Sequence, residues 1–112
     1  MNKIFRGEIW LCDLNPSIGH EQKGIRPALI LSDDMFNQSL SGMVIVIPIT
    51  SKYKGIPSHI EIDNDFLDQK SFIKSEDIRA ISTHRLIKKL GVVESSVMET
   101  VEECVKMILG FA

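Results

Sequence analysis

The sequence has few aromatic residues, few cysteines and no long hydrophobic run. Its 112 residues include one Trp, one Tyr and five Phe, so Ile, Val and Leu supply most of the large apolar side chains. The longest nearly unbroken apolar stretch, residues 43–49, is far too short to span a bilayer. The first residues lack the apolar segment of a signal peptide. We therefore expect a single cytoplasmic domain, residues 1–112, built mainly from β-structure and without a membrane partner.

Cysteine and histidine show no metal-binding pattern. Cys12 and Cys104 are far apart, and neither has a His or Cys beside it at the spacing of a metal site. We predict two free, buried thiols in a reducing compartment, the alternative being a disulfide. His59 and His84 are expected at the surface, outside any ligand pattern. The sequence therefore predicts no metal and no cofactor.

The charge is nearly balanced but unevenly distributed. The net charge of −2 does not by itself indicate a nucleic-acid-binding protein. Residues 94–112 carry −3 and the remaining residues +1. A local basic groove is compatible with this distribution, and scattered surface charge is the alternative.

Short strands and a late helix dominate the predicted secondary structure. Apolar or alternating stretches bounded by turn residues predict strands at 6–14, 25–32, 43–49, 59–62, 71–75 and 77–81. The last two could instead be one strand bent around Glu76. Capping residues and helical spacing predict one turn after Ser32, a short helix from Ser82 or Thr83 to Lys88, and a final helix from Glu94 or Ser95 to Gly110. We expect a turn at 64–69, an extended link at 90–93 and, as a whole, a barrel-like, mainly β domain.

Two predicted strands are apolar on both faces. Residues 9–12 and 43–49 are apolar at consecutive positions, so both faces should be covered. One face can line the core, and a partner subunit can cover the other; burial of both faces in a single barrel is the alternative. Together with an apolar face on the last helix, this pattern predicts a symmetric homodimer.

A polar loop bracketed by glycines precedes the second strand. Gly19 and Gly24 flank residues 20–23, His-Glu-Gln-Lys, and Arg26 and Pro27 follow. Glycine permits unusual backbone angles and proline fixes the backbone. Reactive side chains are thus delivered at the mouth of a rigid strand, where binding and catalytic residues tend to collect. A solvated hairpin loop is the alternative.

Three stretches of the sequence resemble the MazF/PemK family of toxin endoribonucleases, which includes Kid. They are Arg-Gly-Glu-Ile-Trp-Leu at 6–11, residues 19–32 with the pattern Glu-Gln-x-Gly-x-Arg-Pro, and Pro-Ile-Thr-Ser at 48–51. The likeness continues through 78–82 and 85–86 to the last helix. It implies an SH3-like barrel, a homodimer, and metal-independent, sequence-selective cleavage of single-stranded RNA to 2′,3′-cyclic phosphate and 5′-hydroxyl ends. It also implies a cognate antitoxin that covers the groove.

The resemblance also implies catalytic positions. Family members use a loop Arg and a strand-end Thr, which match Arg26 and Thr50. Kid-like members use a loop His and an Arg-x-Asp pair; His20 matches the first, and the pair falls on Lys74 and Glu76. Both charges of the pair are kept, but both side chains differ. Because these two side chains differ from the family pattern, the resemblance does not fix which residues act as acid and base, nor which RNA sequence is cleaved.

The chemistry assigns roles to these residues. Cleavage through the 2′-hydroxyl needs a base, a cation beside the phosphorane and an acid for the leaving oxygen. Arg26 suits the cation role because its planar fork grips two phosphate oxygens; a structural ion pair is the alternative. Thr50 can donate to a phosphate oxygen, or merely cap its strand. His20, Glu21 and Glu76 are the candidate acids and bases, and the sequence does not choose among them.

Further residues are expected to contact RNA. Mostly basic and lying near the loops, they are Lys23, Ser51, Lys52, Tyr53, Lys54, Lys74, Asp77 and Arg79. Residues 52–57 combine lysines with one aromatic ring, a combination that suits backbone binding and base stacking; a solvated loop is the alternative. An antitoxin tail that competes for this groove should be acidic and disordered until bound.

Two other functions fit the same fold. One is a CcdB-like toxin that poisons DNA gyrase by binding and cleaves no RNA. The other is an inactive domain that only holds a partner peptide. Fold alone does not separate these functions.

Overall fold

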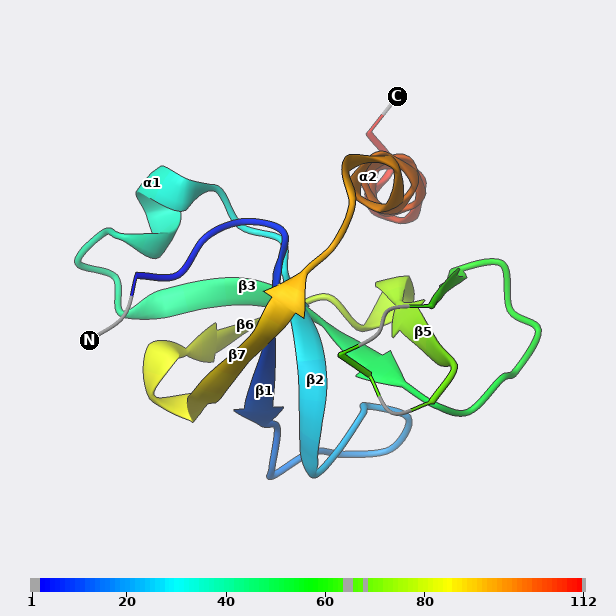
Figure 1. Ribbon diagram of the computed structural model, residues 1–112, viewed down its shortest axis with the longest axis horizontal. Helices are drawn as coiled ribbons and strands as arrows, with labels where there is room; N and C mark the ends of the chain where they lie inside the picture. Colours follow the sequence, from blue (N-terminus) through cyan, green and yellow to red (C-terminus); the bar gives the residue numbers. More distant parts are fainter. Residues whose placement is uncertain (1–2, 64–65, 68, 112) are drawn as a thin grey trace.

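Seven antiparallel strands and a C-terminal helix make up the computed structural model, which describes residues 3–63, 66–67 and 69–111. The strands are β1 (Glu8–Asp13), β2 (Ile25–Ile30), β3 (Met43–Thr50), β4 (His59–Ile62), β5 (Ser71–Lys74), β6 (Arg79–Ser82) and β7 (Leu86–Val92). They form one sheet in the order β4-β5-β3-β2-β1-β7, with β6 paired to β3. The sheet curls on itself, and helix α2 (Ser95–Leu109) follows β7 (Figure 1). The expected mainly β class with short helices and a C-terminal helix is confirmed.

Strand β3 lies at the centre of the fold, and its own chain covers both of its faces. Its first half pairs with β6, residues 46–48 pair with β2, and its last two residues pair with β5. Val44 and Val46 pack in one core cluster with residues of β1, β2 and β6. Ile47 and Ile49 pack in a second cluster that includes residues of α2. The interpretation that β3 needs a partner subunit for cover is therefore wrong, because the curled sheet and α2 supply it.

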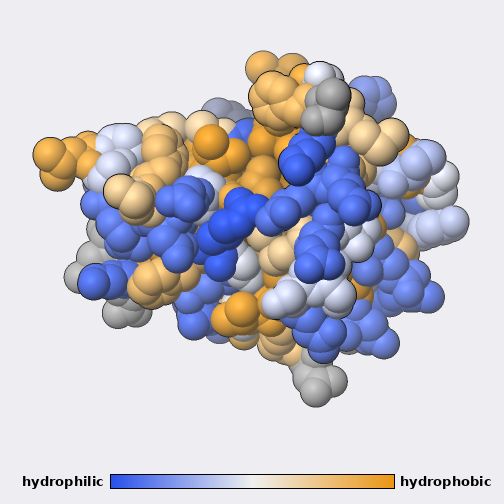
Figure 2. Space-filling model, turned by 90° about the horizontal axis from the view of Figure 1, so that it is seen from above, coloured by the Kyte–Doolittle hydropathy of each residue, from blue (hydrophilic) through white to orange (hydrophobic). Residues whose placement is uncertain are grey.

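Helix α2 is only partly buried along its apolar face. Glu94 precedes the first turn, and Gly110 ends the helix at a φ of 80°, where a side chain would be strained. Val101 and Val105 are buried against the sheet, whereas Ile108 is 42% exposed and Leu109 is 52% exposed. The last turn thus leaves apolar side chains at the surface. Figure 2 views the molecule from the side on which α2 lies and shows hydrophobic residues gathered beside hydrophilic ones.

The predicted helix from Ser82 or Thr83 to Lys88 is wrong. Only Thr83–Arg85 forms a single 3-10 turn, in which Ser82 Oγ accepts a hydrogen bond of 3.2 Å from His84 N. The chain then continues as β7, which pairs with β1 and includes most of the predicted link at 90–93. Pairing with the free edge of β1 satisfies the backbone groups of this segment and overrides its local helical pattern.

The remaining elements follow the sequence more closely. Helix α1 (Asp34–Asn37) is one turn, and Asp33 caps it by accepting a hydrogen bond of 2.9 Å from Met35 N. A 3-10 turn, Ser75–Asp77, separates β5 from β6, so the alternative with two short strands is confirmed. The predicted turn at 64–69 includes residues 64, 65 and 68, which lie outside the described residues.

Both cysteines are free, as predicted, but only Cys12 is fully buried; Cys104 is half-buried. Burial raises the pKa of the Cys12 thiol to about 12, so this group stays protonated and unreactive at neutral pH. Within the described part of the chain, no helix is both long enough and apolar enough to cross a membrane.

Candidate active site

The strand register brings Arg26 and Thr50 to the same place. In the β2–β3 pair, Ala28 lies opposite Pro48 and Leu29 opposite Ile47. Continuing this antiparallel register by two residues sets Arg26 opposite Thr50. Because side chains alternate along a strand, both then point to the same face. The two residues are 24 positions apart in the sequence, yet both line the same depressions of the surface.

Arg26 and Thr50 line a depression that we call the central hollow. Its other lining residues come from the β1–β2 loop, from the loop after β3, and from β4 and β5: Gly19, His20, Glu21, Gln22, Lys23, Lys52, Lys54, His59 and Lys74. The glycine-bracketed loop therefore does face the strand-end Thr. Gly19 and Gly24 have φ angles of 61° and 85°, values that explain glycine at both ends of the loop.

The guanidinium of Arg26 is partly satisfied and partly free. Its Nε donates a hydrogen bond of 3.2 Å to the carbonyl oxygen of Lys23. This bond fixes the side chain against the loop. Among the described residues no hydrogen bond engages the two terminal nitrogens of the guanidinium. A half-buried guanidinium with a free two-pronged edge suits a phosphate group.

The hydroxyl of Thr50 is buried and oriented. The side chain is 6% exposed, and Oγ1 accepts a hydrogen bond of 3.2 Å from Lys52 N. Since Oγ1 acts as acceptor there, its own proton remains available for a group bound in the central hollow. Thr50 thus combines the cap expected from its strand-end position with a free donor.

The β1–β2 loop carries the other candidates. His20 is exposed and lines the central hollow. The carboxylate of Glu21 accepts a hydrogen bond of 2.8 Å from Ile18 N, which closes a turn of the loop. Lys23 is exposed, and its carbonyl oxygen holds Arg26. The loop therefore places a proton-exchanging imidazole, a carboxylate and an ammonium beside Arg26.

Three buried charged residues fasten this loop to the sheet, and we call them the Asp77 clamp: Lys74, Asp77 and Arg79. Asp77 Oδ2 accepts hydrogen bonds of 2.7 Å from Gln22 N and 2.7 Å from Arg79 Nη2. Arg79 Nη2 also donates a hydrogen bond of 2.8 Å to the carbonyl oxygen of Gln22. Lys74 Nζ donates to the carbonyl oxygen of His20 and lies 3.8 Å from Asp77 Oδ2. The clamp thus holds the backbone on both sides of Glu21.

Direct RNA contact by the clamp residues stays a prediction, and the structure shows their charged groups engaged within the protein. The side chains of Lys74, Asp77 and Arg79 are only 7%, 10% and 15% exposed, and their charged groups bind the loop and one another. Lys74 still borders the central hollow, but its ammonium is already used by the protein. The sequence shows that these residues are charged, but it does not show that they pair inside the protein, because the pairing joins β5 and β6 to the distant β1–β2 loop.

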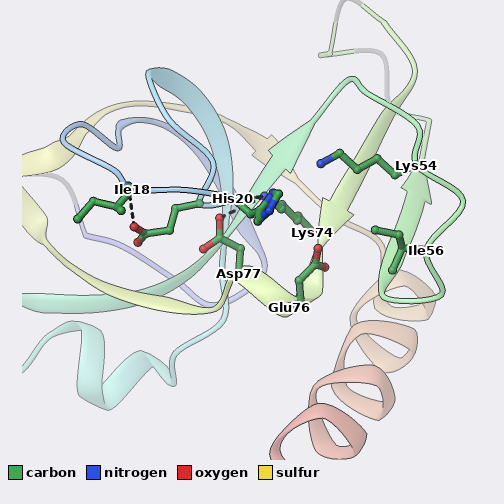
Figure 3. A pocket seen from close by; sticks show the side chains of 8 residues that line it. Ile18, His20, Lys54, Ile56, Lys74, Glu76 and Asp77 are labelled. Carbon is green, nitrogen blue, oxygen red and sulfur yellow. Dashed lines mark hydrogen bonds and ion pairs between the residues drawn. The ribbon is translucent and has the colours of Figure 1, made fainter.

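A second depression lies beside the central hollow, and we call it the flank hollow. Its lining residues are Ile18, His20, Glu21, Lys54, Ile56, Lys74, Glu76 and Asp77 (Figure 3). Four residues line both hollows: His20, Glu21, Lys54 and Lys74. Glu76 lines the flank hollow only. The structure therefore separates Glu76 from the Arg26–Thr50 pair, whereas it keeps His20 and Glu21 next to that pair.

Glu76 is fixed by two neighbours, one of them an unexpected buried histidine. Its Oε1 accepts a hydrogen bond of 2.7 Å from Ser58 Oγ, and its Oε2 lies 2.8 Å from His59 Nε2. The His59 side chain is 1% exposed, so the prediction of a surface histidine is wrong; pairing with a carboxylate offsets the cost of burying the ring. His84 is exposed, as expected.

The surroundings of Glu76 keep it charged. Partial burial acts to raise the pKa of the carboxyl, but hydrogen bonds from Ser58, from its own backbone and from His59 outweigh burial, and the pKa is lowered. A carboxylate with a lowered pKa gives up no proton at neutral pH and is a weak base. These properties disfavour Glu76 as the catalytic acid or base.

A third depression, the outer hollow, adjoins Arg26 and Thr50 on their other side. Besides those two it is lined by Leu11, Pro27, Ile49, Ser51, Phe66, Leu67, Gln69, Ser71, Lys88 and Leu90. Ser51 is thus near the site, as expected. Tyr53 lines none of the three hollows; its ring packs 5.3 Å from the ring of Phe72. The sequence missed this hollow because it depends on the pairing of β7 with β1.

Most of the exposed charged side chains around the central hollow are positive. Lys23, Lys52 and Lys54 are exposed there, and Arg26 has its terminal nitrogens free, whereas Glu21 is the carboxylate of the same loop. Such a surface attracts phosphate in an otherwise acidic chain. Among the described residues, no group of three or more His, Cys, Asp or Glu could hold a metal ion.

Comparisons with known proteins agree with this architecture. A family model described as PemK-like, MazF-like toxin of type II toxin–antitoxin system matches residues 5–109. The endoribonuclease MazF of Staphylococcus saprophyticus is 38% identical over 109 residues, covering 94% of this chain and 90% of the relative. The endoribonuclease EndoA of Bacillus subtilis is 34% identical over 111 residues, covering 96% and 95%. A crystal structure of MazF from Deinococcus radiodurans is similar at a TM-score of 0.88 and 26% identity, covering 98% and 99%.

Proposed function

Because the chain belongs to the PemK-like, MazF-like family of toxins of type II toxin–antitoxin systems, we propose that it is an endoribonuclease toxin that cleaves single-stranded RNA in the cytoplasm. The single observation that carries the proposal is the pair formed by Arg26 and Thr50, opposite each other by register in a hollow bordered by free lysines. The matched family model and the two named relatives are of the MazF type and not of the CcdB type, so the gyrase-poisoning alternative is set aside.

The reaction follows from the groups in the central hollow. The phosphate of the scissile bond sits between the Arg26 fork and the Thr50 hydroxyl, which stabilise the charge of the phosphorane. The neighbouring 2′-hydroxyl loses its proton and attacks phosphorus, and the bond from phosphorus to the 5′-oxygen breaks. That oxygen takes up a proton and leaves as a 5′-hydroxyl, while the other fragment keeps a 2′,3′-cyclic phosphate. No metal enters this sequence of steps.

The residues that transfer protons lie on the β1–β2 loop. His20 lines both the central and the flank hollow, and histidine is the side chain that most often serves as a general acid or base. Glu21 is the neighbouring carboxylate, held by Ile18 N. We assign acid–base catalysis to these two residues and phosphate stabilisation to Arg26 and Thr50. The clamp residues act as positioning residues, since they touch the loop and not the proposed phosphate position.

A homodimer and an antitoxin complete the proposal. Exposed apolar side chains at the end of α2, Met107, Ile108, Leu109 and Phe111, remain without cover in the single chain and favour self-association. A single species with the mass of one chain at micromolar concentration in sedimentation would contradict the dimer. The cognate antitoxin should present an acidic segment, disordered when free, to the lysines of the central hollow, and so compete with RNA.

The loop after β3 provides a test of RNA binding at this site. Lys52 and Lys54 line the central hollow and are exposed, so the double variant Lys52→Ala/Lys54→Ala should fold normally. If each lysine contacts one phosphate of a single strand, the slope of log affinity against log salt should become shallower by about 1.4. The measurement is the affinity for a single-stranded oligonucleotide over a salt series, together with the cleavage rate.

The matched control is Lys3→Ala/Lys106→Ala, which removes the same charge from exposed positions outside the three hollows. It should leave the salt slope unchanged. An unchanged slope and affinity in the Lys52→Ala/Lys54→Ala variant would remove the loop from the RNA groove.

A further inference from the structure

The flank hollow has the position and size of a site for one nucleobase. Its volume is about 380 Å³, ample for a flat heterocycle, and it shares His20 and Lys54 with the central hollow. A strand whose phosphate lies between Arg26 and Thr50 would therefore bring an adjacent nucleotide to this hollow. Single-stranded RNA is read in such places, by stacking on the base and by hydrogen bonds to its Watson–Crick edge.

Two apolar side chains stand on opposite loops beside the flank hollow. Ile18 is 83% exposed on the β1–β2 loop, and Ile56 is 41% exposed on the loop between β3 and β4. Figure 3 shows His20 between them. Exposed isoleucines cost free energy in water, and the faces of a base would cover them. They explain affinity for a base but not the choice of base.

The polar groups of the hollow supply that choice. Glu76 is held by Ser58 and His59, one on each carboxylate oxygen, and each oxygen keeps a free lone pair. Because the carboxylate is ionised, it only accepts hydrogen bonds. Across the hollow, Lys54 only donates, and Figure 3 shows its ammonium pointing from its loop toward His20. The hollow therefore offers a rigid double acceptor and a separate donor.

Only one of the four RNA bases matches this arrangement fully. The Watson–Crick edge of guanine presents two adjacent N–H donors, N1 and the N2 amino group, beside the O6 acceptor. Adenine and cytosine each present a single amino donor on this edge, and uracil sets one N–H between two carbonyl oxygens that a carboxylate would repel. We propose that the flank hollow is a guanine subsite in which Glu76 accepts from N1 and N2 and Lys54 donates to O6. This inference rests on the proposed function, of which it specifies the sequence preference.

Binding of 3′-mononucleotides tests the subsite without requiring cleavage. Guanosine 3′-monophosphate should bind the full-length protein about tenfold or more tightly than uridine 3′-monophosphate, the discrimination expected of one bidentate pair. Inosine 3′-monophosphate, which lacks the N2 amino group, should fall between them. Methyl signals of Ile18 and Ile56 should shift on guanosine 3′-monophosphate binding. Equal affinity for the guanosine and uridine nucleotides, or tighter binding of the adenosine or cytidine nucleotide, would overturn the proposal.

A variant separates Glu76 from general effects on the fold. Glu76→Gln keeps the size of the side chain but replaces one acceptor oxygen with a donor, so the preference for guanosine should disappear while uridine binding stays unchanged. The matched control is Glu61→Gln, an exposed carboxylate on β4 that pairs with Lys70 and lines none of the three hollows. It should keep the wild-type preference. A guanosine preference that survives in Glu76→Gln would overturn the assignment.

The cleavage sites of the wild-type enzyme on a random RNA give the second readout. Guanine should be enriched at one fixed position near the cut, and the enrichment should be lost in Glu76→Gln. If the protein binds guanosine 3′-monophosphate selectively but cleaves no RNA, the ribonuclease function fails and the subsite stands. If it cleaves RNA with no preference for guanine at any position, the subsite fails and the ribonuclease function stands.

Discussion

Replacing Arg26 with Ala should lower kcat for RNA cleavage by about 10²–10³-fold, the usual cost of removing one group that stabilises a charged transition state. Among the described residues, the guanidinium is held by the carbonyl oxygen of Lys23 alone, and its terminal nitrogens make no hydrogen bond that would compete with phosphate. Arg26 is the second residue of β2, and no ion pair among the described residues uses it. The variant should therefore fold. The measurement is single-turnover cleavage at saturating enzyme, with thermal unfolding as the check on folding.

Arg26→Lys separates the charge from the geometry. A lysine keeps the positive charge but lacks the planar fork, so its rate should lie between those of wild type and Arg26→Ala. Lys106→Ala, a charge removal on the last turn of α2, should cleave RNA at the wild-type rate. Near-normal cleavage by folded Arg26→Ala protein would end the assignment of Arg26 as the phosphate-stabilising residue.

Replacing Asp77 with Ala should lower the free energy of unfolding by about 3–5 kcal/mol, the range for removing one partner of a buried ion pair. The change leaves Lys74 and Arg79, with side chains 7% and 15% exposed, without their counter-charge, and it leaves Gln22 N without its acceptor. The β1–β2 loop should then lose its fixed position, so kcat should fall even at temperatures where the variant is folded. Denaturant unfolding measures the first effect. Cleavage at about 10–20 °C below the variant's Tm measures the second.

Glu61→Ala is the matched control for Asp77→Ala. It also breaks a carboxylate–lysine pair, at 3.3 Å, but both side chains are more than half exposed. Solvent screening should hold its cost to about 1 kcal/mol or less. An Asp77→Ala variant no less stable than Glu61→Ala would contradict the clamp.

Sequence reasoning predicted the loop and the strand end that carry the candidate catalytic groups, because local rules govern these elements. The glycines at 19 and 24 mark a loop, and Pro27 fixes the backbone directly after Arg26. Thr50 follows the apolar run at 43–49. Runs of consecutive apolar residues predicted β2 and β3, and family resemblance connected their ends. That Arg26 and Thr50 line one hollow became visible only with the strand pairing, which no local pattern encodes.

The parts that sequence reasoning missed depend on contacts between distant segments. The predicted helix extended to Lys88, but residues 86–92 form β7 and pair with β1, because that edge needs a partner. His59 carries no local sign of burial, since its cover and its partner Glu76 belong to a later segment. Lys74 and Arg79 were predicted to bind RNA because charge suggests solvent exposure, whereas Asp77 holds both inside the protein.

We propose that this chain cleaves RNA through the 2′-hydroxyl, with the scissile phosphate held between Arg26 and Thr50. The most direct measurement is incubation of a mixed single-stranded RNA with purified, folded protein in EDTA, followed by analysis of the fragment ends. The wild-type protein should give fragments with 2′,3′-cyclic phosphate and 5′-hydroxyl ends, and Arg26→Ala should give almost none. Intact RNA with the wild-type protein, or fragments with 3′-hydroxyl and 5′-phosphate ends that form only when metal is added, would contradict it.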